Sequence, residues 1–217
     1  MAIGGWEESR HSAPGRKNPC LSYAAETMSN AAKRRATYDD VLAAPAHMVA
    51  EVVDGVLHTQ PRPALPHARA ASRLGGVLDG PFDRGRGGPG GWVILDEPEL
   101  HLAEDIVVPD VAGWRRARMP RVPMEAAFVT LAPDWVCEVL SPRTQAFDRG
   151  AKMDVYAREG VSHAWLLDPL ARLLEVWRLE QGEGPRWVRV ATWTGDAVVR
   201  AEPFDAIELE LADLWAD

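Results

Sequence analysis

The sequence predicts an α/β domain of the α+β type, in which a β-sheet is flanked by helices. Three observations lead to this prediction. Short β-branched runs at residues 106–108 and 135–140 are typical of strands, and an apolar stripe with helical spacing runs through residues 67–78. After residue 163, further strand-like runs are separated by turn residues, which predicts an antiparallel C-terminal extension of the sheet.

The composition is that of an ordinary globular protein, since 47% of the 217 residues are hydrophobic and 26% are charged. No apolar run reaches the ~18 residues of a membrane helix, and the N-terminus lacks the apolar core of a signal peptide. We therefore expect a cytoplasmic protein with no membrane partner. The net charge of −8 argues against a protein that coats nucleic acid non-specifically. Cys20 and Cys137 have no zinc-site spacing, and Cys137 falls on an apolar strand face, which predicts its burial.

Residues 1–36 carry no periodic apolar pattern and are predicted to be a disordered N-terminal tail. Met28 lies shortly before the ordered pattern, so translation from Met28 is one hypothesis for the start. The folded domain is expected to comprise residues 37–217. It opens with Thr37 as the N-cap of a short helix that reaches about Ala44, with Asp40 three residues after the cap.

A β-hairpin follows at residues 49–60, because both residues of Asp54-Gly55 favour the positive φ of a tight turn. Glu51 lies on its first strand and, from the local pattern alone, is a solvent-facing glutamate. His67 begins the helix of residues 67–78, where a cap or surface position is the favoured interpretation. Residues 80–91 hold six glycines without the spacing of a phosphate-binding loop, which favours a flexible connection.

Strands at residues 92–95 and 99–102 are predicted to pair around Asp96-Glu97-Pro98. The segment from Trp114 to Arg121 carries four arginines, and two interpretations stay open. It is either a loop that grips phosphate beside an aromatic ring or a solvated basic loop.

Glu138 is the most informative residue of the central strand. Side chains alternate along residues 135–140, so Val136, Glu138 and Leu140 share one face. A glutamate in so apolar a run requires a cation, a proton or an exit to solvent, because burying an unpaired carboxylate is costly.

Two further acids and a lysine accompany Glu138. Asp110 follows Pro109, which cannot donate to a strand ladder and marks a strand end or an irregularity. Asp148 and Lys152 are four residues apart and share one face if their segment is helical. Carboxylates with one lysine suit the binding of a hard cation and the stabilisation of charge on a phosphate.

Together these motifs resemble the Uma-type restriction endonuclease family, a branch of the PD-(D/E)XK nuclease superfamily. The resemblance extends from Thr37 to the C-terminus and rests on the combined string. Its parts are P-D-V at 109–111, P-D-W-V-C-E-V-L-S-P at 133–142, D-R-G-A-K at 148–152, Tyr156, G-V at 160–161 and W-L-L-D-P at 165–169. The resemblance implies a restriction-endonuclease-like core with a mixed β-sheet, and Mg²⁺ or Mn²⁺ held by Asp110 and Glu138.

The resemblance also implies roles for two other residues. Glu51 matches an upstream glutamate of the family, as a third metal-site carboxylate or a water-orienting group, and Glu51 or Asp148 would complete the coordination. The superfamily's usual lysine, two residues after the glutamate, is replaced by Leu140, which makes Lys152 the candidate. The implied catalytic residues are thus Asp110, Glu138, Lys152 and Glu51.

The leading functional interpretation is a Mg²⁺-dependent endonuclease that hydrolyses phosphodiester bonds in nucleic acid, with DNA as the expected substrate. Leu140 keeps open a catalytically inactive nucleic-acid-binding or interaction module on the same fold. A metal-free hydrolase that uses the same acids as an acid/base pair is a third possibility. Superfamily nucleases commonly pair, and the tryptophan-rich C-terminal strands offer apolar surface, so a homodimer built partly on residues after Leu173 is expected.

Overall fold

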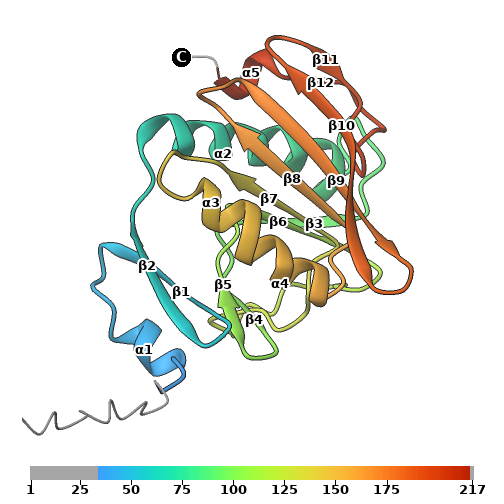
Figure 1. Cartoon of the computed structure of the whole chain (residues 1–217). Helices are drawn as coiled ribbons and strands as arrows, with labels where there is room; N and C mark the ends of the chain where they lie inside the picture. The colour runs from blue at the N-terminus through green and yellow to red at the C-terminus, as the bar shows by residue number, and fades with distance from the viewer. Residues whose placement is uncertain (1–33, 216–217) are drawn as a thin grey trace, which may run out of the picture. The chain divides into compact units, whose positions relative to one another are not determined.

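The computed structural model describes residues 34–215, so most of the predicted tail, with Cys20 and Met28, lies outside the described residues. One compact unit begins at Arg35. It contains a six-stranded sheet, a four-stranded sheet and a short two-stranded ladder, with helices on both faces of the largest sheet (Figure 1). None of the helices between residues 34 and 215 has the length and apolar character that a membrane crossing requires.

The elements in chain order are α1 (Tyr38–Leu42), β1 (Met48–Val53), β2 (Val56–Pro61), α2 (Leu65–Leu78), the π-helical turn η1 (Asp79–Asp83), β3 (Trp92–Asp96), β4 (Leu100–Leu102), β5 (Asp105–Val107), β6 (Val111–Arg115), β7 (Trp135–Val139), α3 (Gln145–Phe147), the π-helical turn η2 (Asp148–Lys152), α4 (Met153–Arg158), β8 (His163–Asp168), β9 (Leu173–Gln181), β10 (Pro185–Thr194), β11 (Val198–Val199), β12 (Leu209–Glu210) and α5 (Ala212–Trp215).

Local sequence signals at the start of the domain are confirmed. The backbone N–H of Thr37 donates to the carboxylate of Asp40 (2.8 Å), which forms the expected capping box at α1. Asp54 (φ 53°) and Gly55 (φ 77°) make the tight turn between β1 and β2, which pair in antiparallel register. The predicted helix of residues 67–78 is α2 and begins two residues earlier.

The largest sheet has the order β10-β9-β8-β7-β6-β3. Only β7 and β8 in it are parallel, and the helical segment α3-η2-α4 connects them, as a parallel pair requires a long crossover. The predicted mixed sheet is therefore confirmed. The antiparallel extension is confirmed for β9 and β10, whereas β11 pairs with β12 in a separate ladder. The chain leaves the sheet at Gly195, whose φ of 66° turns it away after Thr194.

The expected pairing of residues 92–95 with 99–102 is wrong. β3 pairs with β6 in the large sheet, and β4 pairs with β5 in the four-stranded sheet of order β2-β1-β5-β4. Glu97 adopts a positive φ of 45° and donates its N–H to the carbonyl of Asp110 (3.0 Å). This turn directs the chain from one sheet to the other, so the two neighbouring strands separate.

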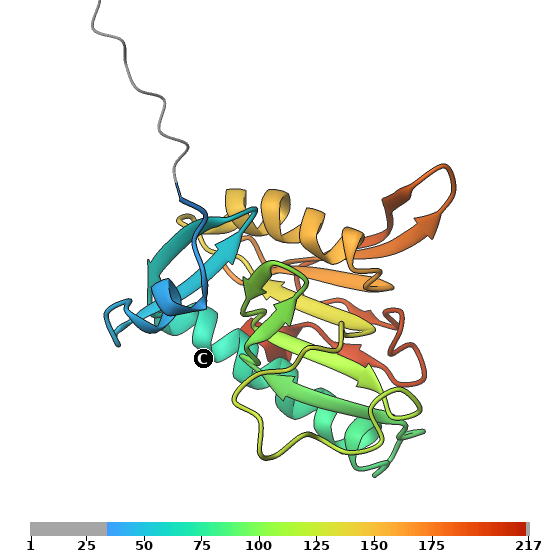
Figure 2. The same cartoon turned by 90° about the horizontal axis from the view of Figure 1, so that it is seen from below.

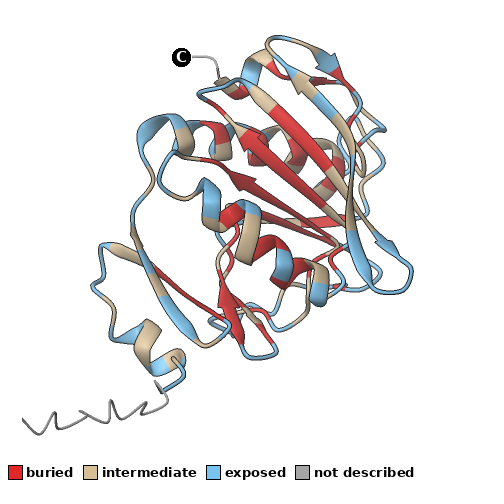
Figure 3. Cartoon of the chain, viewed as in Figure 1, coloured by how far each residue is buried: buried red, intermediate tan, exposed pale blue. Residues whose placement is uncertain are grey.

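The large sheet is covered on both faces (Figure 2). On one face, Leu74 of α2 packs in a core with Trp135, Cys137 and Val139 of β7. On the other face, Val136 and Leu140 share a core with residues of α4. The buried residues of Figure 3 follow these central strands. The alternation predicted for residues 135–140 and the burial of Cys137 are thus confirmed.

The tryptophans serve mainly as core residues. Four of them are almost completely buried: Trp92, Trp114, Trp135 and Trp165. In the C-terminal strands, Trp187 packs against the core of α4 and donates its Nε1–H to the carbonyl of Met153 (2.9 Å). Much of the apolar surface that the sequence assigned to these strands is therefore used inside the domain.

Candidate functional site

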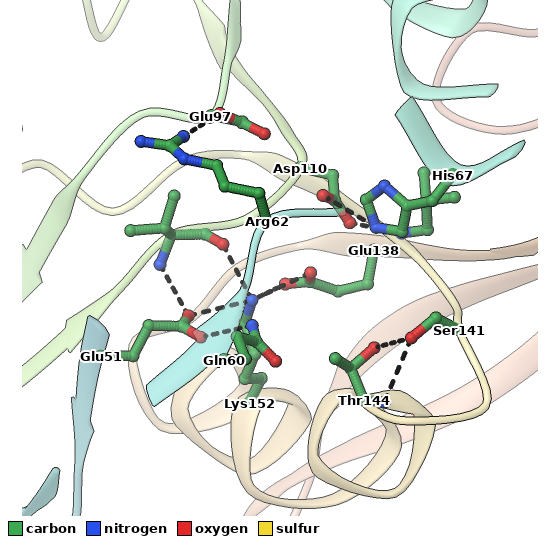
Figure 4. Close-up of polar contacts among 12 residues, drawn as sticks. Glu51, Gln60, Arg62, His67, Glu97, Asp110, Glu138, Ser141, Thr144 and Lys152 are labelled. Atoms are coloured by element: carbon green, nitrogen blue, oxygen red, sulfur yellow. Dashed lines mark hydrogen bonds and ion pairs between the residues drawn. The ribbon is translucent and has the colours of Figure 1, made fainter. Parts of the chain in front are cut away.

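A cavity of about 410 Å³ lies where the large sheet meets the β1–β2 hairpin and the start of α2. Its lining includes Asp110, Glu138, Asp148, Lys152 and His67. These side chains come from four separate segments of the chain, and Figure 4 shows how several of them converge. The folding of the chain thus brings three of the predicted site residues, Asp110, Glu138 and Lys152, to one cavity.

Asp110 stands just before β6, after the proline that ends the preceding extended segment. Its Oδ2 accepts the backbone N–H of Val139 (2.7 Å), and its Oδ1 lies 3.2 Å from Nε2 of His67. Both carboxylate oxygens therefore have fixed partners. The side chain of Asp110 is 14% exposed and that of Glu138 is 2% exposed, so Asp110 is the more accessible of these two acids.

Glu138 lies on β7 and is held by two side chains of the following helical segment. Nζ of Lys152 lies 2.9 Å from each of its carboxylate oxygens. The hydroxyl of Tyr156 donates to Oε1 of the same carboxylate. Lys152 also donates to the carbonyl of Val108 (2.9 Å). The side chains of Glu138, Lys152 and Tyr156 are all buried. They form a polar network shielded from water, in which the loss of any one hydrogen bond would be costly.

Glu51 completes the surroundings of the lysine. Its Oε1 lies 3.1 Å from Nζ of Lys152 and accepts the backbone N–H of Val108 (2.9 Å). Its Oε2 accepts an N–H of Gln60 (3.2 Å). The solvent-facing interpretation of Glu51 is wrong, because the residue is buried. Its role as a metal ligand stays a prediction, and its observed contacts place it beside the lysine.

Burial and neighbouring charges set the ionisation of these groups. Burial raises the pKa of Glu138 well above its usual range, and the charges of Asp148, Asp110 and Glu51 act in the same direction against the opposing effect of Lys152. Burial alone would lower the pKa of Lys152, but Glu138 and Glu51 outweigh it and hold this pKa well above the usual value. Lys152 is therefore a permanent cation at the site.

Asp148 is an acid of the cavity whose pKa lies near neutrality. Burial raises its pKa to about 6, although Lys152 and a hydrogen bond with Thr144 act to lower it. Asp148 is the first residue of η2 and Lys152 is the last, so both groups lie on one π-helical turn. Such turns are often found at functional sites.

The acidic side chains of the cavity are possible ligands for a divalent cation. Among residues 34–215, no group of three or more His, Cys, Asp or Glu side chains is arranged to hold a metal ion. Mg²⁺ is commonly bound by only one or two protein carboxylates and keeps several waters, and Asp110 and Glu138 supply two carboxylates at this cavity. Four acidic residues surround one lysine here, and a divalent cation would offset the excess of negative charge.

Two residues of the site were missed by sequence reasoning. The expectation of a cap or surface role for His67 is wrong, since its side chain is 11% exposed and contacts Asp110. Its Nδ1 is buried and has no hydrogen-bond partner among the described residues. No local pattern relates position 67 to position 110. Tyr156 carried a weak signal, because it lies four residues after Lys152 and so shares a helical face with it.

Other candidates lie away from the cavity. Trp114 is buried in β6 and donates its Nε1–H to the carbonyl of Leu131 (2.8 Å), so it is no exposed ring beside a phosphate-gripping loop. Arg116 and Arg118 form ion pairs with Asp83 and Asp134. Leu140, at the superfamily's usual lysine position, is buried in the core. The cation beside Glu138 therefore comes from η2 and not from the strand.

Comparison with known proteins supports this description. The model of the Uma2 family, described as "Putative restriction endonuclease", matches residues 36–212. None of the curated proteins matches this chain. A crystal structure of "a putative nuclease belonging to DUF820" from Anabaena variabilis has a TM-score of 0.65 and 23% sequence identity, covering 83% of this chain and 97% of that one. The predicted fold class and the family resemblance are thus confirmed.

Proposed function

This chain belongs to the Uma2 family of putative restriction endonucleases, and from that premise we propose that it is a metal-dependent endonuclease that hydrolyses phosphodiester bonds in DNA. One observation carries the proposal. Asp110, Glu138 and Lys152 come from three separate segments and meet at one cavity. Two acids and a cation in a desolvated pocket suit hydrolysis of a phosphodiester, where charge must be stabilised on the phosphate.

We assign Asp110 and Glu138 as the residues that hold Mg²⁺ or Mn²⁺. When bound, such an ion polarises the phosphate and lowers the pKa of a nearby water molecule. Glu51 remains a proposed third carboxylate, but its contacts with Lys152 and Val108 favour a role in holding the lysine.

The remaining residues would orient these acids and move protons. His67 donates to one oxygen of Asp110 and the N–H of Val139 to the other, which fixes the carboxylate plane. Tyr156 holds Glu138 in the same way. Lys152 would place a positive charge beside the scissile phosphate. Asp148, with its pKa of about 6, is suited to take up a proton near neutral pH.

The test is a cleavage assay combined with a metal-binding measurement. Plasmid, linear duplex and single-stranded DNA are incubated with the purified protein in Mg²⁺, Mn²⁺ or EDTA. Asp110→Asn and Glu138→Gln are each expected to abolish cleavage and to lose Mn²⁺ binding in isothermal titration. Glu99→Gln is the matched control, because Glu99 pairs with His101 and does not line the cavity. Undiminished Mn²⁺ binding in both site variants would contradict the assignment.

A second candidate function is a nucleic-acid-binding or interaction module without turnover. It is favoured by the state of Lys152, whose three N–H donors already face Val108, Glu138 and Glu51. Nucleic-acid binding without cleavage under any metal condition would support this candidate. Cleavage that persists in EDTA would instead support a metal-free hydrolase. The cytoplasmic location expected from the sequence stays a prediction.

A further inference from the structure

The acidic centre of the site lies at the bottom of a cavity. The side chain of Glu138 is 2% exposed and that of Asp110 is 14% exposed. The cavity of about 410 Å³ has the size of a site for a small molecule, which is roughly 300–1,000 Å³. A duplex carries its phosphates on the outside of a stiff rod, and smooth bending into so small a hollow would be costly. A flexible single strand meets this constraint more easily.

A second hollow of about 520 Å³ continues the cavity along β2 and the start of α3. The two hollows adjoin each other, since they share four lining residues: Gln60, Pro61, Arg143 and Thr144. Together they form a groove with the β1–β2 hairpin on one side and the segment after β7 on the other. We call this feature the hairpin groove. A substrate strand that enters the acidic cavity could lie along this groove on the protein surface.

An aromatic pair lines the outer part of the hairpin groove. His58 of β2 and Phe147 of α3 stack with their ring centroids 4.4 Å apart and their planes at 29°. Both rings are half-buried and line the second hollow. Proteins that bind single strands use such aromatic faces because unstacked bases can stack on them, whereas the bases of a duplex are already stacked.

Arg143 joins the two hollows and supplies charge for a backbone phosphate. It is exposed and lines both of them. No hydrogen bond or ion pair connects it to another side chain within residues 34–215, in contrast to Arg149, which pairs with buried Glu175. A guanidinium without an acidic partner is suited to bind phosphate. The net charge of −8 gives the chain little general attraction for duplex DNA.

We propose that the hairpin groove binds a single-stranded segment of nucleic acid and delivers it to the acidic cavity, so that an intact duplex is not the preferred substrate. Phe147 and His58 stack on bases, and Arg143 contacts the backbone. The proposal rests on the proposed function and names the substrate class of the same site.

The test compares two labelled probes by fluorescence anisotropy. One is a single strand of about twelve nucleotides, within the usual footprint of single-strand binders, and the other is a duplex of the same sequence. Ca²⁺ replaces Mg²⁺ to suppress cleavage during the titration. The single strand is expected to bind at least ~10-fold more tightly than the duplex. Phe147→Ala and Arg143→Ala are each expected to weaken single-strand binding by about 10-fold, as loss of one stacked base or one phosphate contact predicts.

Arg121→Ala is the matched control, since Arg121 is also exposed and lines neither hollow. Because Arg143 is also exposed, its replacement by alanine should leave the fold unchanged. Weaker binding by this variant would therefore report a lost contact with the strand and not a loss of folding. Equal or tighter binding of the duplex, no binding of either probe, or an equal loss in the Arg121 and Arg143 variants would overturn the proposal. Selective single-strand binding without cleavage in Mg²⁺ would uphold it and refute the nuclease function. Equal binding and equal cleavage of the single strand and the duplex would support the nuclease function and refute the preference for a single strand.

Discussion

Lys152 reaches Glu138 from the helical segment that follows the strand, with Nζ 2.9 Å from each carboxylate oxygen. The strand position where the superfamily usually has its lysine is Leu140, which is buried in the core. The same charge is thus brought to the glutamate by a different element. Since Lys152 also contacts Glu51 and Val108, it neutralises two buried acids and links β1, β7 and the segment after β5.

Replacing Lys152 by methionine is expected to affect both stability and cleavage. Glu51 and Glu138 would be left buried without a cation, and breaking a buried pair in this way costs roughly 3–5 kcal/mol of unfolding free energy. If the enzyme remains folded, cleavage should slow by about 10²-fold or more, because one charge stabiliser of the transition state is lost. Urea unfolding and single-turnover cleavage rates measure the two effects.

The double variant Glu138→Gln with Lys152→Met is the control for stability. It removes both members of the pair, so it should be more stable than Lys152→Met alone, although it should remain inactive. A Lys152→Met protein that is as stable and as fast as the wild type would show that the lysine has no role at this site.

His67 is expected to act on metal affinity through Asp110. Its Nε2–H fixes one oxygen of that carboxylate, and loss of such a supporting hydrogen bond commonly costs about 10- to 100-fold in metal affinity. His67→Phe should therefore weaken Mn²⁺ binding in this range and reduce cleavage at low metal concentration. His163→Phe is the control, because His163 is also partly buried but pairs with Glu202, away from the cavity. Unchanged Mn²⁺ affinity in His67→Phe would remove His67 from the site.

The sequence alone allowed part of this site to be predicted. Glu138 was identified because an acid in the apolar strand of residues 135–140 needs a partner. The spacing placed Lys152 on one helical face with Asp148, and the family resemblance implied its catalytic role. His67 was not identified, since its contact with Asp110 is created by the packing of α2 on the sheet. Local spacing carries no information about such long-range contacts.

The fold shows the same division between local and long-range information. The turn at Asp54-Gly55 follows from local preferences and was predicted, and so was the helix of residues 65–78, with its start placed at residue 67. The partners of β3 and β4 were not, because a strand pattern records which residues are buried and not which strand lies beside them. Glu97, with its positive φ, decides the path of the chain there and carries no clear sequence signal.

A homodimer built partly on residues after Leu173 remains a prediction. β10 is a ten-residue edge strand of the large sheet, and an open strand edge is a common site of pairing between chains. Size-exclusion chromatography with light scattering at micromolar concentration should then give about twice the chain mass of 23.8 kDa. A mass equal to that of a single chain would contradict the prediction.

Asp148 is expected to make stability depend on pH. Its pKa is about 6 in the folded protein and has a usual value of 3.8, so the folded state keeps the proton that the unfolded chain has already lost. The protonated form therefore stabilises the fold fully below the usual value, and this contribution is lost as the pH rises through about 6. The lost contribution is about 3 kcal/mol at most, from 1.36 kcal/mol per pKa unit.

Asp148→Asn removes this titration, so the variant should gain stability relative to the wild type between about pH 4 and pH 7. Urea unfolding at a series of pH values, with EDTA present to exclude metal binding, measures the difference. Asp154→Asn is the matched control, because Asp154 lies on the same helical segment but is exposed and does not line the cavity. If the difference between Asp148→Asn and the wild type is constant across this range, the buried acid does not titrate in it. Asp148 would then lack the ionisation that its proposed part in proton uptake requires.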